Sequence, residues 1–361
     1  MLTYMVKINK HIEIVRCGNP RLSSMGLKSC NMIGKTLSRH YARVGTTTVN
    51  NEHDIALLVA KKPDLVFLGF KNMPTLSPYP TNTEESWIAD HLDSHGINYT
   101  GSTKLAMMLD HNKDAAKQVI CEAGLQTAPY FTARSGEYSN AGELPLPLPL
   151  FIKPPKEGGG IGIGDDSVVR NFAAYKRKVA NIERDFGTPA LAEQYLTGRE
   201  FSVAILETPR SKELIAMPIE LITEQNSRGD RILGQKVKSA DTEHVIAVAD
   251  KDIKDAIVTL AIDAFKILGA RDYGRIDIRL DEQGIPHFLE ANLIPGVAQH
   301  DFTSYFTSAC WINQAMDYET MLLHIVELGL SRAVDIGEDL VERDMVPVTV
   351  SPSLEAAFEP V

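Results

Sequence analysis

Residues 273–292, YGRIDIRLDEQGIPHFLEAN, contain two strand patterns separated by a turn. Charged and apolar residues alternate from Arg275 to Leu280, which is typical of a half-buried β-strand. Residues 281–284, DEQG, have the composition of a turn, and residues 285–292 form a return strand. The stretch therefore predicts an antiparallel hairpin with one charged face.

The charged face of this hairpin gathers oxygen ligands. With a four-residue turn, Arg275 lies opposite Glu290 and Asp277 lies opposite Phe288, and residues paired in this way share a face. Carboxylate and carboxamide oxygens suit Mg²⁺ or Mn²⁺, and an arginine beside them could steady charge on a transferring phosphoryl group. The alternative is an ordinary amphipathic hairpin whose polar face is solvated. The residues expected on one surface are Arg275, Asp277, Glu290 and Asn292.

A glycine-rich run, FIKPPKEGGGIGIG at 151–164, follows a predicted strand. Glycines let backbone N–H groups approach a phosphate closely, and Lys153 at the end of the strand could reach the same phosphates. The run fits neither the GxGxxG fingerprint nor the GK[ST] ending of a P-loop. It is either a phosphate-binding loop or a flexible hairpin tip. Four of its glycines fall within five residues: Gly158, Gly159, Gly160 and Gly162.

Two further segments place charged residues where a nucleotide could bind. Lys113 stands near the start of a predicted helix, a position at which most lysines are solvated. Residues 190–206, ALAEQYLTGREFSVAIL, indicate two strands around a Thr-Gly turn. Glu193 lies where the chain can present backbone groups to an adenine edge. Glu200 can face a ribose or a metal, and a plain surface acid is an equal alternative.

Strand and helix patterns alternate through the first hundred residues. The strands are HIEIVRCG at 11–18 and DLVFLGF at 64–70, and residues 24–41 have a helical pattern. Such alternation predicts a parallel α/β domain. We expect an N-terminal α/β domain, a central subdomain, a C-terminal subdomain and an acidic tail, at 1–102, 103–190, 191–335 and 336–361.

Composition narrows the class of protein. The 361 residues carry a formal charge of −10, so general affinity for nucleic acid or anionic membranes is not expected. The four cysteines are scattered without a CxxC pair, which indicates a reducing compartment. The sequence has no apolar run of 18 residues and its start has no secretory pattern. We therefore expect a cytoplasmic protein.

Four stretches, taken together, resemble the ATP-grasp superfamily in its D-alanine–D-alanine ligase branch, over about residues 97–330. The resemblance implies a fold of α/β and α+β parts, in which an N-terminal Rossmann-like (pre-ATP-grasp) domain precedes two α+β subdomains that clamp a nucleotide. It also implies ATP, two Mg²⁺ ions or Mn²⁺ in their place, and a homodimer. The stretches are YTGSTKLAMMLDHNK, FIKPPKEGGGIGIG, LAEQYLTGREFSVAIL and GRIDIRLDEQGIPHFLEANLIPG.

The resemblance assigns the nucleotide to residues of the two subdomains. Lys113 and Lys153 would contact the ATP phosphates beside the glycine-rich loop. Glu193 would lie in the adenine hinge and Glu200 at the ribose. The loop glycines given to the phosphates are Gly158, Gly159 and Gly160.

The resemblance also assigns the reaction centre. Arg275 and the backbone near Gly296 would stabilise an oxyanion. Lys236, in GQKVKS, would lie in a mobile loop that closes over the γ-phosphate. The two metal ions are given to the hairpin donors Asp277, Glu290 and Asn292.

The chain departs from the family pattern where the amino acids are read. The family uses a glutamate, a serine and a tyrosine for its first D-alanine, whereas this chain has no acid in 18–26 and has Gly159 and Val237 at the other two positions. A serine that donates to the second carboxylate in the family is Asp301 here. A carboxylate would repel another carboxylate and favour an ammonium or hydroxyl group, although Asp301 could also be a plain surface acid.

The predicted function is therefore an ATP-dependent carboxylate–amine ligase for small molecules, with substrates other than two D-alanines. ATP would phosphorylate a carboxylate, and an amine would attack the acyl phosphate to form an amide. The alternatives are a true D-alanine–D-alanine ligase, a nucleotide-binding protein without catalysis, and a ligase that activates another group such as an enolised ketone. The substrate-reading stretches are expected at 17–26, 69–86 and 301–305.

Overall fold

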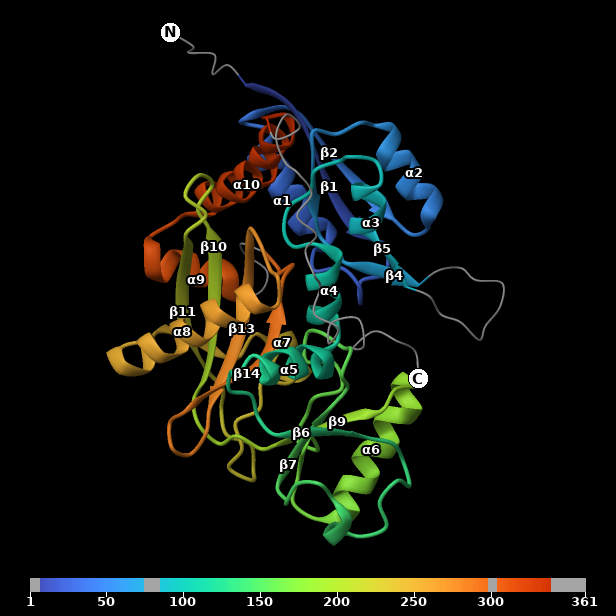
Figure 1. Cartoon of the computed structure of the whole chain (residues 1–361), viewed down its shortest axis with the longest axis vertical. Helices are drawn as coiled ribbons and strands as arrows, with labels where there is room; N and C mark the ends of the chain where they lie inside the picture. Colours follow the sequence, from blue (N-terminus) through green and yellow to red (C-terminus); the bar gives the residue numbers. More distant parts are fainter. Residues whose placement is uncertain (1–6, 75–84, 298–303, 339–361) are drawn as a thin grey trace.

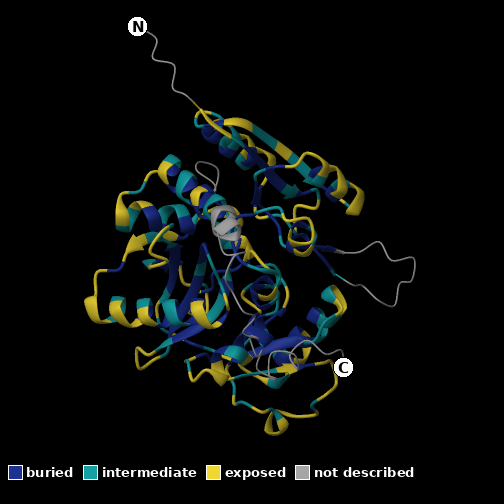
Figure 2. Ribbon diagram, turned by 45° about the horizontal axis from the view of Figure 1, so that its top comes forward, coloured by how far each residue is buried: buried dark blue, intermediate teal, exposed yellow. Residues whose placement is uncertain are grey.

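The computed structural model describes residues 7–74, 85–297 and 304–338 (Figure 1). Three lobes follow one another along the long axis of the molecule, with the N-terminal lobe at the top and the lobe that carries α6 at the bottom of Figure 1. Buried residues concentrate in the strands, and exposed residues line the outer helix faces and loops (Figure 2). In the described ranges, no helix is long and apolar enough to span a membrane.

The N-terminal lobe is built on a parallel sheet in the order β2-β1-β3, which confirms the predicted α/β domain. The helix predicted at 24–41 is shorter, because Tyr41 already begins the next strand. A small antiparallel pair, β4 and β5, lies beside the sheet. The elements are β1 (Ile8–Cys17), α1 (Leu27–Leu37), β2 (Tyr41–Val49), α2 (Glu52–Ala60), β3 (Leu65–Leu68), β4 (Asn72–Pro74), β5 (Glu85–Trp87) and α3 (Ile88–Asp93).

The central lobe is an antiparallel sheet in the order β6-β9-β7-β8, covered by α6. The strand β9 pairs with both β6 and β7, so this sheet extends to Gln194. The boundary expected after residue 190 therefore falls inside β9 and is four residues too early. The elements are β6 (Tyr130–Ala133), the short 3₁₀ turn Ala141–Glu143, β7 (Leu150–Lys153), β8 (Val168–Val169), α6 (Phe172–Phe186) and β9 (Ala190–Gln194).

The C-terminal lobe is a five-stranded antiparallel sheet in the order β12-β11-β10-β13-β14. One face of this sheet packs on α8, whose apolar side includes Ile257, Leu260 and Phe265. The strands are β10 (Glu200–Glu207), β11 (Leu214–Ile222), β12 (His244–Ala247), β13 (Tyr273–Leu280) and β14 (Pro286–Asn292). The helices are α7 (Gln235–Ala240), α8 (Lys251–Ile267) and α9 (Tyr305–Gln314).

Two expected domain boundaries differ from the packing. The helices α4 (Lys104–His111) and α5 (Lys113–Glu122) share a core with β13, β14 and α8, so they pack on the C-terminal sheet and not on the central one. The helix α10 (Tyr318–Glu338) packs against α1 and β3 of the N-terminal lobe. Apolar faces, and not sequence neighbours, decide where these helices bind.

The hairpin β13–β14 has a different register from the one predicted. Leu280 pairs with Pro286, so the loop has five residues, and Asp277 pairs with Glu290 because one extra residue, Leu289, forms a bulge. Arg275 then pairs with Asn292 and not with Glu290. The longer loop and the bulge each shift the pairing by one residue. Two shifts restore the side-chain period of two, so the predicted face is retained.

Candidate functional site

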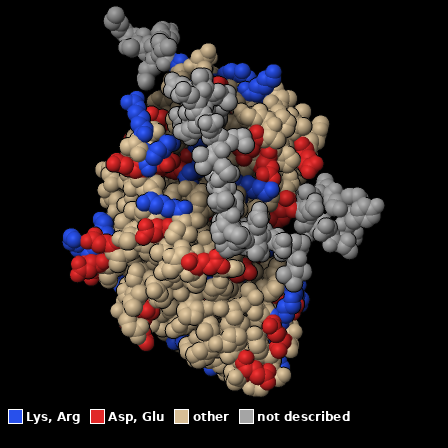
Figure 3. Space-filling model, in the orientation of Figure 1, with Lys and Arg blue, Asp and Glu red and all other residues tan. Residues whose placement is uncertain are grey.

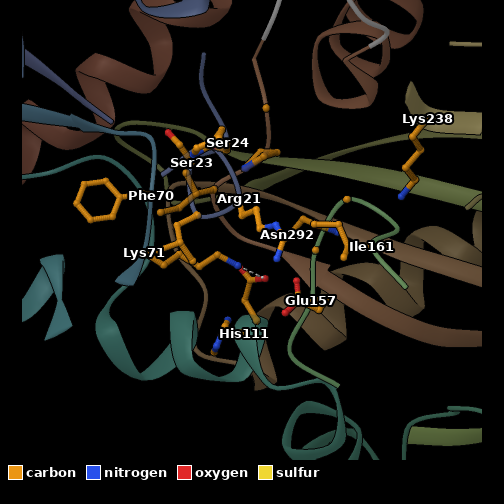
Figure 4. Close-up of a pocket in the computed structure, with 18 of the residues that line it drawn as sticks. Arg21, Ser23, Ser24, Phe70, Lys71, His111, Glu157, Ile161, Lys238 and Asn292 are labelled. Atoms are coloured by element: carbon orange, nitrogen blue, oxygen red, sulfur yellow. Dashed lines mark ion pairs between the residues drawn. The ribbon is translucent and has the colours of Figure 1, made fainter. Parts of the chain in front are cut away.

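A cavity of about 1210 Å³ opens where the three lobes meet. One wall comes from the N-terminal lobe, and the opposite wall comes from the glycine-rich loop, α7 and the β13–β14 hairpin. Figure 4 shows side chains of both walls together with Asn292: Ser23, Ser24, Phe70 and Lys71 from the N-terminal lobe, and Glu157, Ile161 and Lys238 from the other. The three lobes thus share one site.

Asp277 is the centre of the hairpin cluster. Its carboxylate accepts from Arg275 Nε at 2.9 Å and Arg275 Nη2 at 3.2 Å. It also accepts from Asn292 Nδ2 at 3.0 Å and from Ser202 Oγ at 2.6 Å. The predicted convergence of Arg275, Asp277 and Asn292 is confirmed, and Ser202 is an addition that sequence reasoning missed.

Glu290 lies beside Asp277 and faces the lysines. Its carboxylate is 3.3 Å from Lys113 Nζ. Burial works to raise the pKa of Glu290, but the positive charges of Lys113, Lys153, Lys238 and Arg275 outweigh it and lower that pKa to about 2. The carboxylate is therefore ionised at neutral pH, in an environment where cations from both subdomains meet.

The hairpin donors fit a hard divalent cation. Mg²⁺ usually takes only a few oxygen ligands from the protein, such as carboxylates and carboxamides. Water and phosphate oxygens complete its coordination. Within the described residues, no group of three or more His, Cys, Asp or Glu side chains is arranged to hold a metal ion. A metal at Asp277, Glu290 and Asn292 would therefore need phosphate oxygens to complete its coordination.

Lys153 belongs to a buried charge ladder. Glu193 Oε1 is 3.0 Å from Lys153 Nζ and 3.1 Å from Lys117 Nζ, and Lys117 is fully buried. Burial opposes ionisation of Glu193, yet the two lysines hold its pKa below the usual range. Burial lowers the pKa of Lys117 to about 8, against the attraction of Glu193. The side chain of Glu193 is thus engaged in this ladder, and its backbone pairs with Tyr130 and Phe151 of the two neighbouring strands.

Lys117 was not identified from the sequence. It follows Lys113 by four residues on α5, so the two lysines lie on neighbouring turns of one helix face. That spacing was the available signal. Its ammonium group also donates to Thr127 Oγ1 at 2.7 Å, which ties the base of α5 to the ladder.

Glu200 lies at the start of β10 and pairs with Arg279, whose Nη1 is 3.0 Å from Glu200 Oε2. Burial raises the pKa of Glu200, against the attraction of Arg279. The Arg279 guanidinium lies 5.6 Å from the centre of the Tyr195 ring. Glu200 is therefore a partly buried, paired acid and not a free surface residue.

The glycine-rich loop lines the cavity through Gly158 and Gly159. Gly160 has φ = 77°, and a Cβ there would lie 2.9 Å from the backbone nitrogen of Gln235. Only glycine allows this close approach of the loop to α7. The loop is held on its other side by Lys113 Nζ, which donates to the Glu157 carbonyl at 2.5 Å.

The two lysines of α7 differ in position, and the role assigned to Lys236 from the sequence stays a prediction. Lys236 is exposed and does not line the cavity, whereas Lys238 lines it and acts on the charge of Glu290. Ser239, which follows Lys238, also lines the cavity. The reason is helical geometry, because residues two apart on α7 face different directions.

The remaining predicted residues are only partly placed. Gly296 lines the cavity, and its carbonyl accepts from Ser304 Oγ at 2.6 Å. Asp301 lies outside the described residues. Of the stretches expected to read substrates, 17–26 and the described part of 69–86 reach the cavity through Arg21, Lys71 and their neighbours, whereas residues 75–84 and 301–303 lie outside the described residues.

The N-terminal wall is rich in cations. Arg16 and Arg21 line it, and Lys71 pairs with Asp110 at 2.7 Å (dashed in Figure 4). Among the described residues, the Arg16 guanidinium donates only to the Met25 carbonyl and the Thr48 hydroxyl, each at 3.5 Å. On the outer surface, lysines and arginines lie among acidic residues on the face drawn in Figure 3.

The chain is similar in sequence to known ligases. A family model described as "D-ala D-ala ligase C-terminus" matches residues 119–327. The D-alanine–D-alanine ligase of Geotalea uraniireducens is 30% identical over 291 residues, which are 80% of this chain and 86% of that protein. The ligase of Bordetella petrii is 30% identical over 247 residues, 67% of this chain and 71% of that protein.

Solved structures of similar proteins share the fold. A D-alanine–D-alanine ligase from Bacillus anthracis complexed with ATP superposes with a TM-score of 0.67 at 19% identity, covering 91% of this chain and 99% of that one. The ligase from Coxiella burnetii gives 0.66 at 16% identity, covering 91% and 96%. The predicted architecture of an α/β domain followed by two α+β lobes is confirmed.

Proposed function

Because this chain belongs to the D-alanine–D-alanine ligase family and has the ATP-grasp fold, we propose that it joins two D-alanine molecules at the expense of ATP. The chain is an ATP-grasp ligase of this type. The relatives favour D-alanine as the substrate, in place of the different substrates expected from the sequence. The alternative of a nucleotide-binding protein without catalysis is thereby disfavoured.

The observation that carries the proposal is the meeting of oxygen donors and cations at one end of the cavity. Asp277, Glu290 and Asn292 supply the oxygens, and Lys113 and Lys153 approach from the neighbouring elements. A polyphosphate with its cation matches this arrangement in charge and in ligand type. A scaffold protein has no need for it.

The chemistry follows from the placement of these groups. A substrate carboxylate oxygen attacks the γ-phosphorus of ATP and displaces ADP, which yields an acyl phosphate. The amine of the second substrate then attacks the acyl carbon, loses a proton, and the phosphate leaves as the amide forms. Bound Mg²⁺ would supply charge neutralisation of the phosphates at Asp277, Glu290 and Asn292. Most of the rate would come from positioning and fixed charges.

Individual residues have separable tasks in this scheme. Lys113 and Lys153 bind phosphate oxygens, and the amides of Gly158 and Gly159 approach the same group. Arg275 stabilises the oxyanion of the tetrahedral intermediate, with the backbone at Gly296. We assign closure over the γ-phosphate to Lys238, and exclusion of water there protects the acyl phosphate from hydrolysis. Glu193 and Glu200 hold the adenosine end.

The test is turnover with D-alanine as the sole amino acid. Purified protein with ATP and Mg²⁺ should release ADP and phosphate only when D-alanine is added, and mass spectrometry should find the D-alanyl-D-alanine dipeptide. L-alanine is the matched control. Absence of D-alanine-dependent ADP release would contradict the proposal.

The cationic wall favours a second candidate, a ligase of the same chemistry with a more acidic first substrate. Arg16 and Arg21 occupy the wall, and residues 18–26 contain no acid to receive an ammonium group. Cations attract a second carboxylate and repel an ammonium group. Phosphate release with D-aspartate or D-glutamate exceeding that with D-alanine would favour this candidate, and a preference for D-alanine would dismiss it.

The quaternary state, the ions and the location are further parts of the proposal. By family resemblance we propose a homodimer in the cytoplasm, with two Mg²⁺ ions per nucleotide. Light scattering on the purified protein measures the quaternary state. The dependence of ADP release on the concentration of Mg²⁺ or Mn²⁺ measures the requirement for metal ions. A monomer at micromolar concentration would overturn the dimer.

A further inference from the structure

Glu243 is a buried acid on the wall of the cavity, and the proposed reaction gives it no role. It follows α7, lines the cavity and is 7% exposed. One carboxylate oxygen, Oε1, accepts a hydrogen bond from the Tyr305 hydroxyl. The other, Oε2, is buried without a hydrogen-bond partner among the described residues. Leaving such an oxygen unpaired is costly, so a donor that completes it stabilises the site.

Tyr305 keeps this carboxylate apart from the nearby cations. The Arg275 guanidinium lies 5.0 Å and the Lys238 ammonium 6.0 Å from the centre of the Tyr305 ring. Burial and the Glu243 carboxylate raise the pKa of Tyr305, so its hydroxyl stays a donor. The Tyr305 ring therefore lies between the Glu243 carboxylate and the cations of the reaction centre, of which Arg275 is the nearer to the ring.

The other buried acid of the wall shows the contrast. Asp110 pairs with Lys71 at 2.7 Å through one oxygen and accepts from the Leu293 amide at 2.9 Å through the other. Both of its oxygens are occupied. Glu243 has one oxygen to spare and has no lysine or arginine within ion-pair distance in the described part of the chain.

We propose that Glu243 binds the amino group of the amine substrate and so selects an amine over a hydroxyl nucleophile. An ammonium group offers three N–H donors and a positive charge, which match an unpaired carboxylate oxygen, and it transfers one proton to that carboxylate before the neutral amine attacks the acyl carbon. A hydroxy acid offers one neutral donor and leaves the charge of Glu243 uncompensated. The inference deepens the proposed function and rests on it. Glu243 is a specificity-determining residue, and Tyr305 positions it.

The test compares the wild type with Glu243→Gln, which keeps the acceptor for Tyr305 and removes the charge. Steady-state ADP release is measured with D-alanine, and with D-lactate competing at the acceptor position. We expect the KM for the second D-alanine to rise at least about tenfold, the KM for ATP to stay within twofold, and the amine-over-hydroxyl preference to fall about tenfold. Glu224→Gln, an exposed acid outside the cavity, is the matched control.

Two further measurements separate this role from a structural one. Thermal unfolding of Glu243→Gln shows whether the variant folds, and Glu243→Asp, which keeps the charge, should retain the preference for the amine even if its KM rises. An unchanged acceptor KM and preference in a folded Glu243→Gln enzyme would overturn the inference while the proposed function stands. Failure of the wild type to use D-alanine at all would overturn the proposed function, and the inference with it.

Discussion

The two ends of the cavity differ in how their charges are arranged. At the hairpin end, Asp277 and Glu290 are bonded or paired within a converging set that includes Lys113. At the N-terminal end, Arg16 and Arg21 line the wall with no carboxylate within ion-pair distance in the described residues. We propose that the hairpin end binds the metal and the phosphates. We propose that the N-terminal end selects the substrate.

The largest effect is expected from a substitution at the hairpin end of the cavity. Glu290→Gln removes the carboxylate that we propose as a metal ligand, whose pKa of about 2 keeps it charged at working pH. We expect the Mg²⁺ concentration for half-maximal ADP release to rise at least about 100-fold. Glu282→Gln, an exposed acid at the tip of the same hairpin, is the control and should change nothing. Equal responses of the two variants would remove Glu290 from the metal site.

A second pair of variants sharpens the assignment of the loop lysine. Lys238→Met should lower kcat/KM for ATP on the order of tenfold to 100-fold, because a cation next to Glu290 and the phosphates is lost. Lys236→Met should stay within twofold, since this lysine is exposed and outside the cavity. The reverse order would restore the assignment made from the sequence.

A third variant probes the N-terminal end. Arg21 is exposed, so Arg21→Ala should change substrate affinity only about three- to fivefold. If the first substrate carries a second carboxylate, its KM rises by this factor while that of ATP is unchanged. If the substrate is D-alanine, its KM stays the same or falls. Arg43→Ala, an exposed arginine on β2 away from the cavity, is the control.

The smallest expected effect concerns the buried ladder and its pH dependence. Because the pKa of Lys117 is about 8 in the folded protein and higher when unfolded, the unfolded state binds the extra proton above pH 8. This group therefore makes the free energy of unfolding rise between about pH 8 and pH 10. Urea unfolding should show this rise in the wild type relative to Lys117→Met. A constant difference between the two across that range would contradict the shifted pKa.

In the hairpin, the alternation of side chains predicts the shared face correctly even though the register is different from the one predicted. Both the loop length and the bulge at Leu289 were missed, yet a period of two placed Arg275, Asp277 and Glu290 on one face all the same. An alternation pattern determines the face of a strand. It does not determine the partner residue, which depends on turn geometry.

Other residues of the site could not be predicted from local sequence patterns. Lys117 is a lysine in a core, and its partner Glu193 is brought to it from another lobe. Lys238 and Lys236 are the same type of residue on one short helix, and only the direction in which each faces from α7 separates them. The pairing of Glu243 with Tyr305 joins residues 62 positions apart. Long-range packing decides each of these.

We propose that a magnesium–nucleotide complex binds between the hairpin and the lysines of the neighbouring elements. Titration calorimetry with a non-hydrolysable ATP analogue, with and without Mg²⁺, tests it most directly in the wild type and in Asp277→Asn. We predict binding that is strengthened by Mg²⁺ in the wild type and loses that dependence in the variant. Binding that is absent, or identical with and without the cation in both proteins, would contradict the claim.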